Sequence, residues 1–102
     1  MSRHAPDDLS PRAVTLWRYA WRRGYRSPSK LLMVELALRA LDRAEAARTL
    51  IDRDGIAPAS PGGKMAHAHP ALKVEAEARR EFLRMWVALE LDRDDELDAA
   101  FG

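Results

Sequence analysis

The residues whose types and spacing could support chemistry gather in a polar segment rich in glycine and proline. Gly62, Gly63 and Lys64 suggest a loop that holds phosphate through backbone N–H groups and an ammonium group. The phosphate-binding loop of nucleotide hydrolases needs a glycine five positions before its Gly-Lys pair and Ser or Thr after the lysine. Pro58 and Met65 occupy those two positions here. The sequence therefore does not predict nucleotide hydrolysis.

A histidine pair, His67 and His69, follows in the same segment. A metal site needs at least a third donor, and the remaining histidine, His4, lies near the start of the chain. His69 precedes Pro70, a position typical of the residue that begins a helix. We expect no metal site, and we interpret His69 as a helix-start residue.

The carboxylates give no catalytic pattern. Glu75, Glu77 and Glu81 alternate with arginines at the spacing of i,i+4 ion pairs on a solvated helix. No serine has a histidine and an acid in a recognisable arrangement. We therefore expect no catalytic residues and no cofactor, and predict that the protein is not an enzyme.

A basic cluster near the start of the chain is the strongest functional signal. From residue 9 to residue 30 there is no acid, and aromatic side chains alternate with cations. Arginines neutralise phosphates and aromatic rings stack on bases, so the cluster favours a polyanion partner. The alternative stays open, in which the tryptophans belong to the core and the arginines are simply solvated. The cations are Arg12, Arg18, Arg22, Arg23, Arg26 and Lys30, with Lys64 as a further candidate in the glycine loop.

Composition limits the class of protein. With 102 residues, one domain is expected. The absence of cysteine excludes a disulfide scaffold and a cysteine-based zinc site, and suits a reducing cytoplasm. No apolar run is long enough to span a membrane, and the first residues lack the apolar core of a signal peptide. We expect a soluble cytoplasmic protein.

Periodicity predicts an all-α fold that positions these residues. We expect a flexible arm over residues 1–9, a helical domain over residues 10–91 and an acidic tail over residues 92–102. A short basic helix is predicted over residues 11–24, and helices over residues 29–54 and 70–91 then form a long antiparallel hairpin. Much of the apolar content is alanine, which favours a core completed by oligomerisation. The expected oligomer contacts are the Phe82/Trp86 face and the row Ala37, Ala40, Ala44, Ala47 and Ile51.

Residues 29–91 resemble the small subunit of phage terminases. The resemblance rests on the order and spacing of a long helix, a glycine-ended turn, a polar loop and a helix that begins with His-Pro. The matching residues are Asp54-Gly55-Ile56, Gly63-Lys64, His69-Pro70-Ala71-Leu72-Lys73, Glu75, Ala76, Phe82 and Leu89-Glu90-Leu91, where the family often has Leu-Gly-Leu.

The resemblance implies a non-catalytic subunit that assembles as a homo-oligomer, commonly a ring. Such a subunit binds double-stranded DNA at the packaging-initiation site and delivers it to the large terminase subunit, which carries the ATPase and nuclease. It would act in the cytoplasm of a bacterial host. The basic helix lies outside the matched region, so the phosphate contacts come from the charge pattern alone. A helical adaptor that binds an acidic protein partner remains the alternative.

Overall fold

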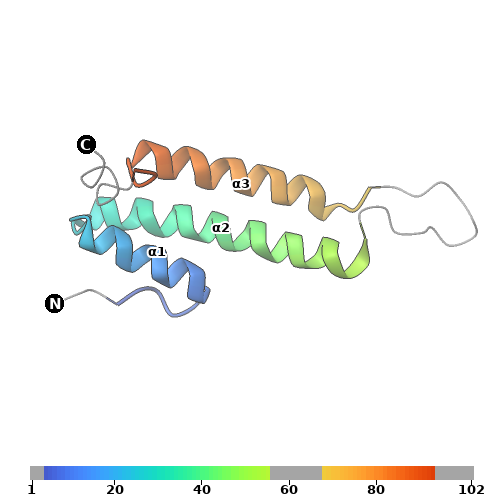
Figure 1. The fold of residues 1–102 in the computed structure, drawn as a ribbon, viewed down its shortest axis with the longest axis horizontal. Coiled ribbons are helices and arrows are strands. Elements are labelled where there is room, and N and C mark those ends of the chain that lie inside the picture. The colour runs from blue at the N-terminus through green and yellow to red at the C-terminus, as the bar shows by residue number, and fades with distance from the viewer. Residues whose placement is uncertain (1–3, 56–67, 94–102) are drawn as a thin grey trace, which may run out of the picture.

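The computed structural model describes residues 4–55 and 68–93, which form three helices: α1 (Pro11–Arg22), α2 (Pro28–Asp54) and α3 (Ala71–Ala88). Helices are the only regular structure in these two ranges, which confirms the all-α prediction there. Figure 1 shows α2 between the other two helices, with α3 running beside it in the opposite direction. No helix in the described ranges is long and apolar enough to cross a membrane.

The first two helices begin and end at the residues that the sequence signals. Ser10 and Ser27 accept hydrogen bonds from the N–H groups of residues 13 and 30, and a proline follows each serine. Serine at the cap satisfies an N–H group that the helix leaves free, and proline has no N–H to lose. Gly24 and Gly55 follow the helix ends with φ values of 92° and 85°, where a Cβ would be strained.

His69 lies two residues before α3 and binds the first N–H group of the helix through its ring. Its Nδ1 accepts the N–H of Ala71 at 3.0 Å, and its Nε2 lies 2.9 Å from Oδ2 of Asp54. Because Nδ1 accepts, the proton of a neutral ring is on Nε2 and points to the carboxylate. The interpretation of His69 as a helix-start residue is confirmed, and the ring also ties α3 to the end of α2.

The end of α3 is a left-handed turn at Glu90. This residue has φ of 59°, and the N–H of Leu91 bonds the carbonyl of Trp86 at 3.0 Å. That bond belongs to the Schellman motif, whose left-handed position usually holds glycine. Glu90 keeps this left-handed turn despite its Cβ.

The alanine row of α2 is covered by α3 of the same chain. All five residues of the row are buried, and Trp86 is buried beside them with Phe82 stacked on it at 5.3 Å. Alanine allows the two helices to approach closely, because its side chain is short. The prediction that this row and the Phe82/Trp86 face make the oligomer contacts is therefore wrong, since both faces are used within one chain.

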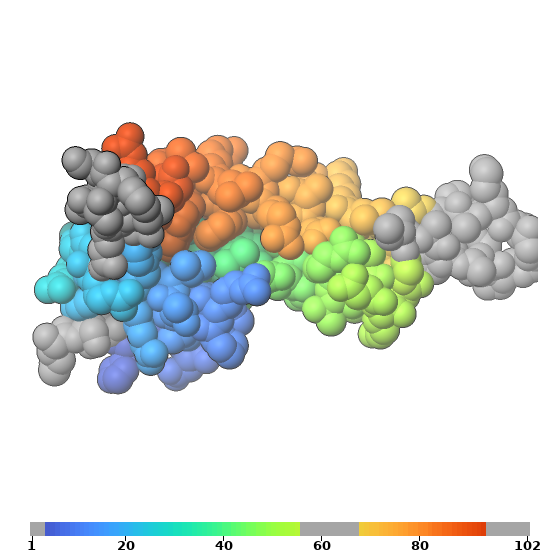
Figure 2. Space-filling view, in the orientation of Figure 1, coloured from blue at the N-terminus to red at the C-terminus, as the bar shows by residue number. Residues whose placement is uncertain are grey.

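The segment before α1 attaches α1 to α2. Asp42 on α2 accepts both the N–H and the hydroxyl of Ser10, at 2.9 and 2.6 Å. Leu9 is buried in the core with Trp17, and Asp8 accepts two hydrogen bonds from Arg39 at 2.6 and 3.1 Å. A flexible arm was expected over residues 1–9, and its last two residues are packed on α2. Figure 2 shows that α1 covers only the first half of α2 and leaves the second half open on that side.

Candidate nucleic-acid interface

Four exposed cations surround the turn between α1 and α2. We call this surface the basic corner and define it by Arg18, Arg22, Arg26 and Lys30. Within the described ranges, none of the four forms an ion pair. The corner includes the N-terminal end of α2, whose aligned peptide dipoles add partial positive charge. The exposed cations and the helix dipole together favour binding of an anionic ligand at the basic corner.

Aromatic rings hold two of the cations in place. The guanidinium carbon of Arg26 lies 4.8 Å from the centre of the Trp21 ring, and its Nε donates to the Trp21 carbonyl at 3.3 Å. The Lys30 ammonium lies 5.7 Å from the Tyr25 ring. A ring face attracts a cation without neutralising its charge. The side chains are thus ordered in part while their charge stays available to a ligand.

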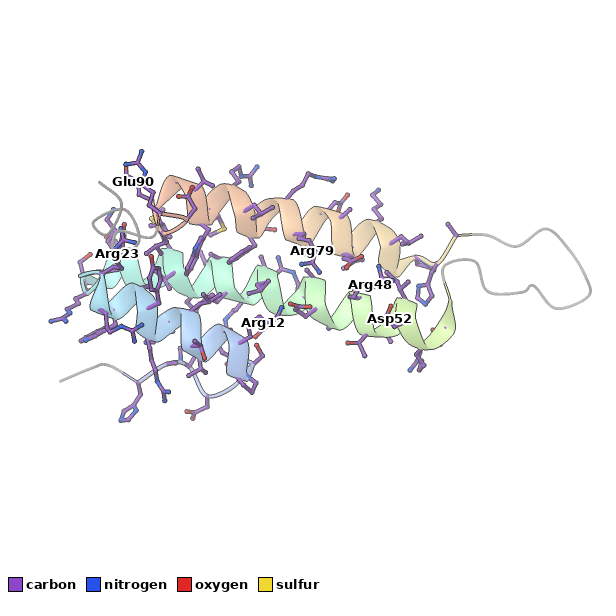
Figure 3. All side chains as sticks on the ribbon, in the orientation of Figure 1. Arg12, Arg23, Arg48, Asp52, Arg79 and Glu90 are labelled. Carbon is purple, nitrogen blue, oxygen red and sulfur yellow. The ribbon has the colours of Figure 1, made fainter. Side chains whose placement is uncertain are left out.

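Arg23, predicted to contact DNA, is held by the end of α3. It donates to the carbonyl of Arg93 at 2.6 Å and to the hydroxyl of Tyr19, which itself donates to the same carbonyl at 2.7 Å. Tyr25 donates to the carbonyl of Leu89. Figure 3 shows Arg23 and Glu90 at the same end of the molecule. These bonds position the corner, and the sequence contains no signal for them because the partners are backbone carbonyls about 70 residues away.

The remaining predicted cations lie elsewhere. Arg12 donates to Glu45 on α2 at 2.6 Å, so its charge is compensated within the chain. Lys64 and His67 lie outside the described residues. In the described part of the chain, no three His, Cys, Asp or Glu side chains gather closely enough to hold a metal ion.

The arginines of the α2–α3 hairpin are paired with acids. Arg48 contacts Asp52 at 2.8 Å and Glu75 at 3.4 Å, and Arg79 contacts Glu75 at 3.1 Å. Figure 3 shows Arg12, Arg48 and Arg79 along the middle of the molecule, away from the corner. The hydrogen bond to Asp52 is the main reason that the pKa of Arg48 is raised. These arginines fasten helices together.

Pairing with basic side chains also lowers the pKa of two acids, Asp54 at the end of α2 and Asp8 in the segment before α1. Hydrogen bonds from Arg53 and then from His69 hold the pKa of Asp54 well below its ordinary value. The hydrogen bond from Arg39 likewise lowers the pKa of Asp8. Both carboxylates therefore stay charged and paired over the physiological range.

Two arginines of α3 resemble those of the corner in exposure and in having no ion-pair partner within the described ranges, but they differ in the acids beside them. Arg80 and Arg84 are exposed and form no ion pair with residues of the described ranges. They lie on the same helix as Glu77 and Glu81, so their neighbourhood is close to neutral. The corner has no acid over the whole stretch from residue 9 to residue 30.

Comparison with known proteins gives no match, whether with protein-family models, with curated protein sequences or with solved structures.

Proposed function

We propose that the protein is a DNA-recognition subunit of the terminase small-subunit type, which binds duplex DNA through the basic corner. The observation that carries the proposal is the group of four exposed cations without an acid partner in the described ranges. A solvated surface of ordinary composition mixes both signs of charge, whereas a phosphate-binding surface gathers one.

The geometry of the corner fits a phosphate backbone. Arg18 and Arg22 lie one turn apart on the exposed side of α1, and Lys30 lies on the first turn of α2. Arginine suits phosphate because its planar donors bind two oxygens at once. In this proposal the corner positions the protein on DNA, and the resemblance adds recognition of a packaging site, assembly as a homo-oligomer, commonly a ring, and delivery to the large terminase subunit.

The test is duplex binding as a function of salt. If about four phosphates are neutralised per protomer, the logarithm of the association constant should fall with the logarithm of salt concentration with a slope near −3.6. Fluorescence anisotropy with a labelled nonspecific duplex between about 50 and 200 mM salt measures this slope. No binding at the lowest salt, or binding that ignores salt, would contradict the proposal.

An acidic peptide distinguishes the alternative function. A helical adaptor would use the same four cations for an acidic protein, and a poly-glutamate peptide would then bind as tightly as duplex DNA of equal charge. A DNA-recognition subunit should prefer the duplex, because duplex DNA carries its charge at high linear density and releases condensed counterions when cations bind. Equal affinity for the two ligands would favour the adaptor.

A further inference from the structure

The outer side of α2 carries a line of side chains that α1 and α3 leave at least partly exposed, touched only at Arg39 by Asp8 and at Arg43 by Glu81 in the described ranges. Leu32, Leu36 and Leu50 are large apolar residues that remain 55%, 46% and 40% exposed. Arg39, Arg43 and Ala46 lie between them on the same side of the helix. The six positions follow each other at intervals of four and three residues, the spacing of a coiled-coil seam. We call this line the α2 seam.

The spacing of the six seam positions is symmetric, so it stays the same when the helix direction is reversed. Its six positions form three pairs centred on position 41: Leu32 with Leu50, Leu36 with Ala46, and Arg39 with Arg43. A second α2 laid antiparallel about that centre would place leucine against leucine at the ends. Closer to the centre it would place a large Leu36 against a small Ala46. Such self-complementarity is what a two-fold interface requires.

A shallow hollow on the seam could accommodate Leu36 of a second copy. Its volume is about 350 Å³, and Leu36 of a reversed second copy would meet the Ala46 side of it. The hollow lies on the seam and is lined by Asp8, Arg39, Asp42, Arg43 and Ala46. A leucine that enters such a hollow is the knob-into-hole packing of coiled coils.

The two arginines at the centre do not oppose this pairing. Arg39 is bonded to Asp8 at 2.6 Å and to Glu35 at 3.1 Å, and Arg43 to Glu81 at 3.1 Å. Their charges are therefore already compensated by acids of the same chain. In the reversed arrangement each central arginine faces a surface of the other copy that holds two acids, Asp8 and Asp42, as well as two arginines, so its net charge is close to zero.

We propose that two copies of the chain associate through the α2 seam as an antiparallel, two-fold dimer. In Figure 1 α1 and α3 lie on opposite sides of α2. Asp42, which binds Ser10 at the start of α1, immediately precedes Arg43 of the seam, so the two directions differ by about 100°. The seam therefore lies about a quarter turn from α1, and a second α2 can approach it. The two-fold axis then places both copies of α1 on one face of the dimer and both copies of α3 on the other.

The dimer would set the distance between its two basic corners. Lys30 lies eleven positions from the centre of the seam, so at about 1.5 Å per residue the two copies of Lys30 lie about 33 Å apart along the helices. Successive major-groove sites on one side of B-DNA lie about 34–36 Å apart. Both corners could thus contact one duplex one helical turn apart, a consequence that rests on the proposed function, whereas the dimer itself does not.

The first test is the mass of the protein in solution. A dimer has twice the chain mass of 11.5 kDa, and Leu36→Glu should raise the dissociation constant by about 100-fold or more, because each change acts at both symmetric sites. Leu83→Glu is the matched control, since Leu83 is 54% exposed on α3 and outside the seam. Sedimentation velocity measures the mass, and circular dichroism checks that each variant folds. A monomeric wild type overturns the proposal. So does a ring or other larger assembly that survives Leu36→Glu, because a two-fold pair closes on itself and a ring of such pairs would still need the seam.

Cysteine cross-linking tests the direction and register even if the charged variant does not fold. The chain has no cysteine, so each introduced thiol is unique. Leu36→Cys mixed with Ala46→Cys should give a disulfide-linked heterodimer. Leu36→Cys alone should not cross-link, because its two copies would lie about 15 Å apart along the helices, beyond disulfide range. A parallel pair reverses both results and would overturn the antiparallel dimer.

Duplex binding separates failure of the dimer from failure of the proposed function. The dimer should bind a 20-base-pair duplex with a salt slope near −7, and the Leu36→Glu monomer with a slope near −3.6. A dimer by mass that ignores duplex DNA contradicts the proposed function alone. A monomer by mass that still binds with a slope near −3.6 contradicts the dimer alone.

Discussion

The arginines at the basic corner and the arginines of the α2–α3 hairpin are the same residue type in opposite roles. Arg48 and Arg79 share the carboxylate of Glu75, whose side chain is only 14% exposed. Arg18 and Arg22 lie on a helix without an acid and keep their charge exposed. The number of arginines therefore says little about function. What distinguishes the corner is the stretch of chain from residue 9 to residue 30, which contains no acid, and this could be read from the sequence.

Charge reversal on α1, compared with charge reversal on α3, should give the largest difference in duplex affinity. Arg18→Glu with Arg22→Glu should lower the affinity for nonspecific duplex DNA by about 100-fold at low salt, because two phosphate contacts become repulsive. Arg80→Glu with Arg84→Glu makes the same change in net charge, at the same i,i+4 spacing, on α3. We expect this control to lose less than about tenfold. Fluorescence anisotropy measures both, and equal losses would mean that only net charge matters.

Arg23 lies next to the basic corner in the sequence but should behave as an arginine of the α2–α3 hairpin does. Arg23→Ala removes donors from the carbonyl of Arg93 and from the hydroxyl of Tyr19. The free energy of unfolding should fall by about 0.5–1.5 kcal/mol, because a charge-assisted hydrogen bond is lost while the exposed carbonyl of Arg93 keeps the Tyr19 hydroxyl as a donor. Urea denaturation measures this loss. The folded Arg23→Ala variant should lose less duplex affinity than Arg22→Ala. A larger loss in Arg23→Ala would mean that Arg23 contacts phosphate.

Glu75 gives the smallest effect and acts on the hairpin alone. Glu75→Gln removes the charge that Arg48 and Arg79 share, while the side chain keeps its size. We expect the free energy of unfolding to fall by about 0.5–1 kcal/mol, since both arginines are partly exposed and solvent screens their interaction. Thermal and urea denaturation check the value. A changed duplex affinity in this variant would break the separation between the two regions.

Local signals predicted the helices well. Ser-Pro pairs marked the starts of α1 and α2, and Gly55 marked the end of α2. Each of these signals depends on residues next to one another in the chain, so no tertiary contact is needed to interpret it. The end of α3 was predicted a turn too late. Leu89 and Leu91 continue the apolar content, and only the left-handed backbone at Glu90 reveals the stop.

Contacts between distant residues could not be predicted in the same way. The alanine row of α2 suggested a partner helix, and periodicity cannot tell whether that helix belongs to the same chain. For the candidate site, the sequence predicted the four cations of the corner from the absence of acids. It also assigned Arg12 and Arg23 to DNA, which stays a prediction. A pattern of charges does not show that Glu45 or the carbonyl of Arg93 lies within reach of these two arginines.

Tyr19, Arg23 and Tyr25 donate hydrogen bonds to the carbonyls of residues 89 and 93. These bonds can form only late in synthesis of the chain. A ribosome makes α1 and the turn first, and the carbonyls that hold them come more than sixty residues later. A chain that stops within α3 would display the corner without the bonds that hold Tyr19, Arg23 and Tyr25 against the end of α3. Ordered presentation of the basic corner is therefore a property of the nearly finished chain, and nascent or truncated copies would compete poorly for the same ligand.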